Sequence, residues 1–324
     1  MHRRRPSSPH RAQRGVALIM ALLVVALVAA LVSQAMRERA RMVETEITDW
    51  QQEQTRWLWL GARQWARLIL REDGRVSGQV DHLAEPWAIP IQPSRLSDFL
   101  LQTQGAVRPG DPQVWLSGQI EDAQARLNVR NLVGNEADTR AARLAFQSLW
   151  RALRLPESEW VMLQNGMNSL LTGQDPKVPS DGPLRPSRLE ELQWWGLSRQ
   201  TLSQLRPHVV LLPDPTPLNL NTAGPLVLAA ALPELSASQL AAFDQARRSQ
   251  PIQSLAQAQL MLRQTDALDA RRFSVNSQFF ELSGRIRLEE TVQSERVLLR
   301  RQGQEVREWQ RTGWPVLPDT PTAP

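Results

Sequence analysis

The sequence predicts an α+β fold, in which a long N-terminal helix precedes an antiparallel sheet that is interrupted by a large all-α insertion. Three observations lead to this prediction. The apolar run Val16–Val32 continues, without a turn signal, into residues with helical spacing. Strand-like alternation of apolar and polar residues then occurs in two separate stretches, residues 74–130 and 273–314. The stretch between them, residues 131–272, has helical spacing and approaches the size of a domain, so we expect it to be an insertion.

The first helix is predicted to cross a membrane over residues 16–36 and to continue as a stem to about residue 73, where Asp73-Gly74 is a stop signal. Beyond the apolar run, apolar or weakly polar residues recur at steps of three and four, which places them on one helix face. We expect the tryptophan-rich end of this stripe to pack against the protein's own domain. The stripe consists of Met36, Ala40, Val43, Ile47, Trp50, Gln54, Trp57, Gly61, Trp65 and Leu68.

Turn-forming residues divide the two strand-rich stretches. Apolar residues on both sides of Ser117-Gly118 indicate a hairpin or short strands. Later in the chain, Phe279–Leu288 alternates apart from an offset at Gly284, and Gln302-Gly303-Gln304 indicates a hairpin turn between two further strands. Residues 315–324 contain four prolines and are predicted to form a disordered tail.

The inserted block is predicted to begin with helices over Thr139–Leu155 and Ser158–Leu171, which a loop over Gly173–Pro186 follows. Two similar units then follow, each with a helix, a tight turn and a second helix. We expect Asn221-Thr222 to cap the helix that carries Pro225 in its first turn. The positions that recur between the two units are Leu189, Leu197, Ser198, Leu202 and Leu205 in the first, and Val227, Leu235, Ser236, Leu240 and Phe243 in the second.

The boundary between Gly15 and Val16 separates a basic lead from the apolar run. Arg14-Gly15-Val16-Ala17-Leu18 resembles the type IV prepilin motif, which implies that a prepilin peptidase removes residues 1–15 and that Val16 is then N-methylated. The positive-inside rule keeps such a lead in the cytoplasm. A plain single-pass anchor and a removable Sec-type signal are the alternatives, and the unbroken helix disfavours the second. The arginines of the lead are Arg3, Arg4, Arg5, Arg11 and Arg14.

Charge and composition exclude several classes of function. The net charge of +5 equals the charge of the arginines before Val16, so the rest of the chain is formally neutral, which removes the electrostatic argument for binding nucleic acid. The absence of cysteine excludes disulfides, thiol catalysis and cysteine–zinc sites. Outside the lead there are only two histidines, His82 and His208, and we expect both to be ordinary surface or loop residues.

No catalytic residue and no metal site are expected. The sequence has no nucleophile elbow, zinc-protease motif, P-loop or dinucleotide fingerprint. Neighbouring carboxylates occur at Glu121-Asp122, Glu190-Glu191 and Glu289-Glu290, and we expect each pair to lie on a solvated face. The sequence therefore predicts a protein that is not an enzyme.

Over roughly residues 12–312, the sequence resembles the minor pseudopilin K family of type II secretion systems, also called general secretion pathway protein K. The order and spacing of several short segments carry the resemblance, since each segment is weak alone. The segments are Arg14 to Leu18, Glu85-Pro86-Trp87-Ala88, Ile120 to Asn131, Pro183-Leu184, Leu189-Glu190-Glu191-Leu192 and Leu218-Asn219-Leu220-Asn221-Thr222-Ala223.

The resemblance implies a pseudopilin α+β fold with a SAM-like or helix-hairpin-helix-like insertion. It also implies a complex with minor pseudopilins I and J at the tip of a periplasmic pseudopilus, and an inner-membrane anchor with the large domain in the periplasm. Most pilins have Glu at the fifth mature position, whereas Met20 occupies it here, and K subunits typically lack that Glu. A buried Glu in such a helix is costly unless it is paired.

Members of this family typically carry an acidic loop that can bind calcium. The corresponding stretch here is Leu163 to Ser169 followed by Gln174-Asp175 and Asp181, in which Asn and Gln stand where acids are expected. Calcium takes six to eight oxygen ligands, several of them carboxylates. The sequence therefore predicts no cofactor and at most weak binding of calcium.

Two other functions are consistent with parts of the sequence. The first is a membrane-anchored DNA-binding protein of a competence system. This alternative rests on the segment that begins at Pro217 to Ala223 and continues as a helix, a turn at Pro233 and a second helix, because that order resembles a helix-hairpin-helix motif. The hairpins at Gly196-Leu197-Ser198 and Pro233 to Ser236 lack the paired glycines of that motif, which disfavours DNA binding. The second is an assembly protein of a type IV pilus, which the sequence leaves open.

Overall fold

The computed structural model describes residues 12–76, 80–98, 113–134, 136–172, 185–263, 268–289 and 291–314. The chain divides into two compact units, residues 1–58 and residues 59–324. The helix α1, Ala12–Val76, contributes its first part to one unit and its last part to the other. The predicted leader before Ala12 and the predicted disordered tail over 315–324 lie outside the described residues.

Helix α1 ends three residues later than the sequence indicates. Asp73-Gly74 was expected to stop it, but the helix runs on to Val76. The side chain of Asp73 accepts a hydrogen bond from Arg301 at 3.1 Å, and a Cβ on Gly74 would lie 3.4 Å from the Arg301 side chain. This tertiary contact stabilises the last turn of α1. The contact could not be predicted from the Asp73-Gly74 stop signal, which depends on the local sequence alone.

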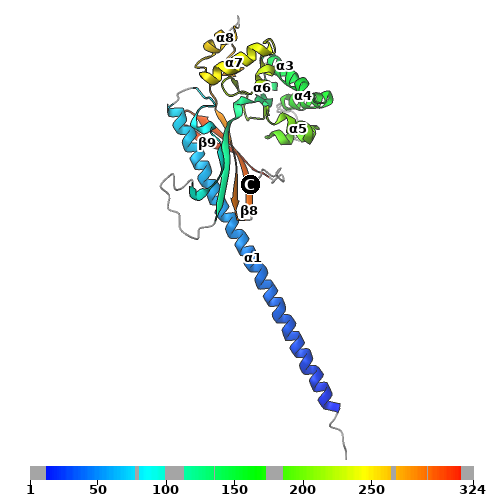
Figure 1. Cartoon of the computed structure of the whole chain (residues 1–324). Helices are drawn as coiled ribbons and strands as arrows, with labels where there is room; N and C mark the ends of the chain where they lie inside the picture. Colours follow the sequence, from blue (N-terminus) through cyan, green and yellow to red (C-terminus); the bar gives the residue numbers. More distant parts are fainter. Residues whose placement is uncertain are drawn as a thin grey trace, which may run out of the picture. The chain divides into compact units, whose positions relative to one another are not determined.

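The larger unit contains a five-stranded antiparallel sheet with the strand order β1-β2-β7-β8-β9 (Figure 1). The sheet therefore joins strands from before and after the helical block, as predicted, and the pairing of β2 with β7 closes the sheet across the insertion. The strands are β1 Ile91–Arg95, β2 Val114–Asp122, β7 Phe279–Leu288, β8 Thr291–Gln302 and β9 Glu305–Trp314.

One face of the sheet packs against the last part of α1. Phe280 and Leu282 of β7 form a core with Leu70 of α1 and with Trp87 of the short 3-10 helix η1, Pro86–Ala88. Trp87 and Phe280 meet edge to face, with ring centroids 5.2 Å apart. The tryptophan-rich end of the stem was expected to pack on its own domain, and Trp59 is buried there at 5% exposure. The predicted stripe is not the packed face, however, because Trp57 and Leu68 are 68% and 50% exposed. The buried face of this part of α1 instead carries Trp59, Ala66 and Leu70.

The offset at Gly284 has a steric cause. Gly284 pairs with Gly118 across β2 and β7, and a Cβ on Gly284 would lie 2.9 Å from the Ser117 carbonyl oxygen and 3.0 Å from the Trp59 ring. A residue with a side chain has no room at this point, so the alternation of apolar residues is interrupted where the tryptophan lies over the strand.

The hairpin predicted at Gln302-Gly303-Gln304 is confirmed. Strands β8 and β9 are joined through Gly303, which has a φ of +59°, a conformation that glycine adopts without strain. The register shifts between Leu298 and Leu299, which places a bulge in β9 beside them.

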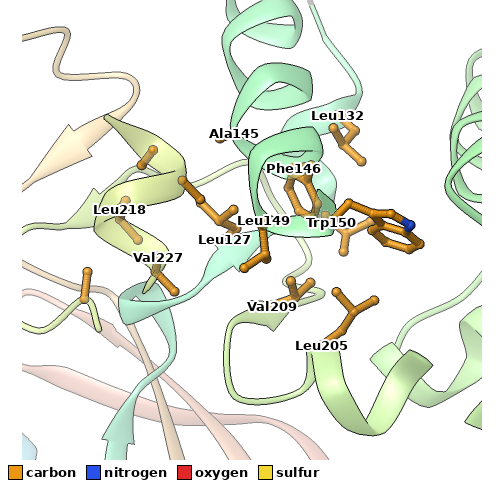
Figure 2. Packing of buried hydrophobic residues seen from close by; sticks show 14 of the residues in the cluster. Leu127, Leu132, Ala145, Phe146, Leu149, Trp150, Leu205, Val209, Leu218 and Val227 are labelled. Carbon is orange, nitrogen blue, oxygen red and sulfur yellow. The ribbon is translucent and has the colours of Figure 1, made fainter. Parts of the chain in front are cut away.

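The helical block lies between β2 and β7 and packs around its own core (Figures 1 and 2). Figure 2 shows Phe146, Leu149 and Trp150 of one helix facing Leu205 and Val209 from later in the block. The helices are α3 Glu136–Ala152, α4 Glu157–Thr172, α5 Arg199–Leu205, α6 Pro225–Ala231, α7 Ala237–Ser249 and α8 Leu255–Leu262, with 3-10 helices η2 Ala123–Ala125, η3 Val129–Leu132 and η4 Leu189–Trp195.

Two short parallel ladders connect the interior of the block to the segments where the chain enters and leaves it. Strand β3, Leu127–Asn128, pairs with β4, Val209–Val210. Strand β5, Leu218–Asn219, pairs with β6, Phe273–Ser274, immediately before the chain returns to the sheet. Strands β3 and β6 lie at the edges of the two stretches for which strands were predicted. Strands β4 and β5 lie inside the block for which the sequence predicted helices alone, because two-residue strands have no period that a pattern can detect.

The two repeated units are present, and they differ from the prediction in two respects: the type of one helix and the cap of another. Ser198 and Ser236 occupy equivalent N-cap positions, and each hydroxyl accepts a hydrogen bond from the backbone N–H three residues later. The first helix of the first unit is the 3-10 helix η4. The cap of α6 was predicted wrongly: Gly224 is the N-cap, and the Asn221 side chain instead exchanges hydrogen bonds with the backbone of Ile252.

Candidate functional site: an exposed apolar helix and a buried polar junction

The N-terminal unit presents a continuous apolar surface. Over Val16–Val43 the mean hydropathy reaches 3.0, and within the described residues this is the one helix long and apolar enough to cross a membrane. Its large apolar side chains are exposed, for example Leu18 at 65% and Leu22 at 61%. Exposure of such a surface to water is unfavourable by about 25 cal/mol per Å², so this helix could anchor in a membrane or pack against other apolar helices.

The predicted processing residues lie at the start of this helix. Gly15, Val16 and Met20 all belong to the first turns of α1, and Met20 is 62% exposed. Cleavage between Gly15 and Val16, N-methylation of Val16 and the role of Met20 stay predictions.

A buried polar junction lies where the sheet meets the helical block, and Asp122 is at its centre. The Asp122 carboxylate accepts hydrogen bonds from the hydroxyls of Thr222 and Ser277, both at 2.6 Å, and from the Gln124 backbone N–H at 2.7 Å. Burial raises the pKa of Asp122 from 3.8 to about 6, while these hydrogen bonds oppose the rise. The expectation of a solvated face is therefore wrong for Asp122, although it holds for the exposed Glu121.

Asn219 connects three separate segments at the same junction. Its side-chain amide nitrogen lies 3.0 Å from Asp122 Oδ2, 3.1 Å from the Ser277 hydroxyl and 3.2 Å from the Asp81 carbonyl oxygen. Its amide oxygen accepts a hydrogen bond from the Asn221 backbone N–H at 2.9 Å. The segments around Asp122 and Asn219 both belong to the motifs that suggested a family, so the structure brings two of those motifs into contact.

Arg301 of β8 extends the network to helix α1. Its guanidinium donates to Asp81 at 2.5 and 2.6 Å and to Asp73 at 3.1 Å. Asp81 also accepts a hydrogen bond from the Ser277 backbone N–H at 2.7 Å. Burial, followed by the charges of Glu85 and Asp81, raises the pKa of Asp73 to about 6, and Arg301 opposes this rise. The junction thereby links α1, the segment before η1, and strand β8.

Asp73, Asp81 and Glu85 come close enough that their oxygens could hold a metal ion. Other groups already occupy them. Arg301 supplies positive charge to both aspartates, and Glu85 accepts hydrogen bonds from the Trp87 indole N–H at 2.7 Å and the His82 backbone N–H at 3.0 Å. The cluster combines three carboxylates with the guanidinium of Arg301, so its formal charge is negative, and binding of a metal ion there stays untested.

The remaining carboxylate pairs and histidines have ordinary roles. Glu190 pairs with Arg206, and Glu191 caps η4 by accepting from the backbone N–H groups of Ser187 and Arg188 at 2.8 and 3.2 Å. Burial lowers the pKa of both His82 and His208. Glu290 and Pro183-Leu184 lie outside the described residues.

The stretch expected to correspond to a calcium loop divides between two environments. Leu163 to Ser169 belongs to helix α4, where Leu163 and Met167 are buried in the core of the block. Asp175 and Asp181, the acids on which weak calcium binding would depend, lie outside the described residues. Calcium binding stays an untested expectation.

Several backbone N–H groups in the hairpins of the two repeated units already donate hydrogen bonds within the protein. In the first, the N–H of Gly196 donates to Gln193, that of Leu197 to Leu192, and that of Ser198 to the Glu159 side chain at 3.0 Å. In the second, the backbone N–H of Leu235 donates to the Leu232 carbonyl oxygen at 3.1 Å, and that of Ser236 to the Gln239 side chain at 2.9 Å. Helix-hairpin-helix motifs bind DNA through such groups, so the structure gives no support to the DNA-binding alternative.

An apolar N-terminal helix, a helix packed on an antiparallel sheet, and a helical block inserted into that sheet together define a pilin-like protein with an enlarged domain. No family model matches the sequence. Type II secretion system protein K of Pseudomonas aeruginosa strain PAO1 is 28% identical, and the match covers 68% of each chain. Type II secretion system protein K of Klebsiella pneumoniae is 29% identical, over 91% of this chain and 94% of the relative.

The fold has a solved counterpart. A chain in the crystal structure of the GspK-GspI-GspJ complex from the enterotoxigenic Escherichia coli type 2 secretion system superposes with a TM-score of 0.60 at 20% identity. The match covers 83% of this chain and 99% of that chain. The predicted resemblance to the type II secretion system protein K family is thereby confirmed, and so is the predicted α+β fold with its helical insertion.

Proposed function

We propose that this chain is the minor pseudopilin K of a type II secretion system and forms, with minor pseudopilins I and J, the complex that initiates and caps the pseudopilus. The similarity to type II secretion system protein K along nearly the whole length of both chains carries the proposal. The fold likeness to a chain from a GspK-GspI-GspJ complex supports it. The protein then acts by assembly and is not an enzyme.

The physical features of the chain fit this role. The exposed apolar surface of α1 suits packing among the transmembrane helices of partner subunits. The helical block between β2 and β7 adds bulk that a repeating filament subunit does not need, which favours a position at the tip. Met20 in place of Glu leaves no buried carboxylate for a neighbouring N-terminal amine to neutralise.

Processing and location follow from the same proposal. A prepilin peptidase cuts between Gly15 and Val16, and Val16 is then N-methylated. The five arginines of the leader stay in the cytoplasm, α1 is anchored in the inner membrane, and the sheet and helical block lie in the periplasm.

Deletion and complementation in the host organism test the function. Loss of the gene should abolish export of the host's type II substrates into the medium, with those substrates accumulating inside the cell envelope, and a plasmid copy should restore export. Unchanged export in the deletion strain, where an otherwise intact secretion system is present, would contradict the proposal.

A further inference from the structure

A small cavity lies between the sheet and the helical block, on the sheet face opposite α1. Its volume is about 70 Å³, and its polar lining comes from β7, β8 and the segment around η4. A cavity of this size has room for a few water molecules or for one small ion, and excludes a nucleotide or a peptide segment. Its charged lining residues are Arg126, Arg188, Glu190, Arg206, Glu281 and Arg296.

Most of the charges around this cavity are arranged in pairs. Glu281 is held by two arginines, with Arg126 Nη2 at 2.9 Å from one carboxylate oxygen and Arg296 Nε at 2.5 Å from the other. Glu190 pairs with Arg206 at the rim. Because Glu281 is only 8% exposed and Arg126 only 11%, these charges interact with little screening by water.

The lining nevertheless carries an excess of positive charge. Four arginines and two glutamates line the cavity among the described residues. A further carboxylate beside the lining is that of Glu191, whose Oε1 lies 3.9 Å from Arg188 Nε and whose Oε2 accepts the capping hydrogen bonds of η4. With Glu191 included, the described charged residues around the cavity sum to a formal charge of +1.

The arginines also repel one another. Burial lowers the pKa of Arg296, Glu281 opposes this change, and the charges of Arg206 and Arg126 add to the lowering. A negative group inside the cavity would relieve that repulsion. Guanidinium groups present forked donors that match the oxygens of carboxylate and phosphate groups.

We infer that this cavity is a binding site for one small oxyanion, a carboxylate or a phosphate group. Among the lining residues, Arg206 belongs to the helical block and Arg296 to β8, so an oxyanion bound to both would bridge the block and the sheet. The oxyanion can be free phosphate or the carboxylate of an acidic side chain on a partner subunit.

Calorimetric titration of inorganic phosphate into the full chain in non-ionic detergent tests the site, with sodium chloride at matched ionic strength as the reference. We expect saturable binding of one phosphate per chain. Arg206→Gln removes the charge excess and should weaken binding at least tenfold, whereas Glu190→Gln increases the excess and should tighten it several-fold. The two variants change binding in opposite directions, so a folding defect in one does not mimic the expected result.

The exposed pair Arg307 and Glu305, on β9 and outside the cavity lining, supplies matched controls. Arg307→Gln and Glu305→Gln should leave phosphate binding unchanged. Absence of saturable binding to the wild-type chain, or equal effects of Arg206→Gln and Arg307→Gln, would overturn the inference.

A second arm distinguishes the two sources of the oxyanion, and it rests on the proposed function. If a partner carboxylate enters the cavity, phosphate and Arg206→Gln should each weaken the complex with minor pseudopilins I and J. If free phosphate is the occupant, that complex should form with unchanged affinity while phosphate still binds the isolated chain. The titration on the isolated chain does not depend on the partners, so its failure is separate from failure of the proposed function.

Discussion

At the residue scale, Asp122 connects segments that are far apart in the sequence, and no pattern in the neighbouring residues indicates these contacts. It ends strand β2, and its carboxylate accepts hydrogen bonds from Thr222 of the helical block and from Ser277 before β7. A buried acid of this kind is tolerated because several donors surround it, and removing the acceptor leaves those donors without a partner.

Asp122→Ala should therefore lower the free energy of unfolding by about 2–4 kcal/mol, through lost hydrogen bonds and the cavity left behind. Urea unfolding followed by tryptophan fluorescence measures the change. The adjacent Glu121→Gln is the control, since Glu121 is exposed, and it should change stability by less than about 0.5 kcal/mol. Similar stability of the two variants would refute the role given to Asp122.

The raised pKa of Asp122 gives a second prediction at this scale. Burial moves the pKa from 3.8 to about 6, so the folded state holds the proton more tightly than the unfolded state does. The favourable contribution is complete below about pH 4 and is lost as the pH rises through about 6. The stability of the wild-type chain relative to Asp122→Asn should thus fall by roughly 2 kcal/mol between pH 4 and pH 7. A flat or rising difference would contradict the assignment.

Sequence reasoning identified the residues of the junction without identifying what they do. The segments containing Asp122 and Asn219 were singled out as motifs, yet Asp122 was placed on a solvated face. The contact of Asp122 with Thr222 joins residues 100 positions apart, and the contact of Arg301 with Asp81 spans 220. The spacing of residues within one element predicts which face of that element is buried. It does not predict which distant segment packs against that face, so contacts of this range could not be predicted.

At the scale of elements, local signals were reliable where the structure is local. The two-helix units and the turn at Gly303 depend on a few neighbouring residues, and each was found from the sequence. The cap of α6 failed because Asn221, a good capping residue, bonds to Ile252 in a different segment. Tertiary contacts also carried α1 past Asp73-Gly74.

The close approach of β7 to α1 gives a prediction about packing. Gly284→Ala places a Cβ 2.9 Å from the Ser117 carbonyl oxygen and 3.0 Å from the Trp59 ring, so strand and helix must move apart. We expect a loss of about 2 kcal/mol or more in the free energy of unfolding. Gly61→Ala is the matched control, because nothing lies within 4 Å of its Cβ and alanine favours a helix by about 1 kcal/mol. A stable Gly284→Ala protein would show that this contact is not tight.

At the scale of the whole molecule, the topology explains how one chain carries a large helical block within an otherwise continuous sheet. Strands β2 and β7 pair along nine residues although the entire helical block separates them in sequence. The short ladder between β5 and β6 and the Asp122 junction return the chain to the sheet where it left. The block can therefore enlarge the domain without interrupting the sheet.

The leader provides a prediction about maturation of the whole chain. The proposed peptidase site requires a residue without a Cβ before the cut, so Gly15→Leu should block removal of residues 1–15. The precursor and the mature form are separable by gel mobility and by intact mass, in cells that contain a prepilin peptidase. Arg11→Gln, which leaves the cleavage motif unchanged, should be processed normally. Normal processing of Gly15→Leu would argue against the prepilin site.

The central claim is that this chain assembles with minor pseudopilins I and J. Co-expression of the full chain with the I and J proteins of the same host, followed by affinity purification on a tag carried by J and mass measurement of the eluate, tests it most directly. The account predicts a complex containing one copy of each subunit, with this chain absent when I and J are omitted. Purification of I and J together without this chain, when all three are expressed and folded, would contradict it.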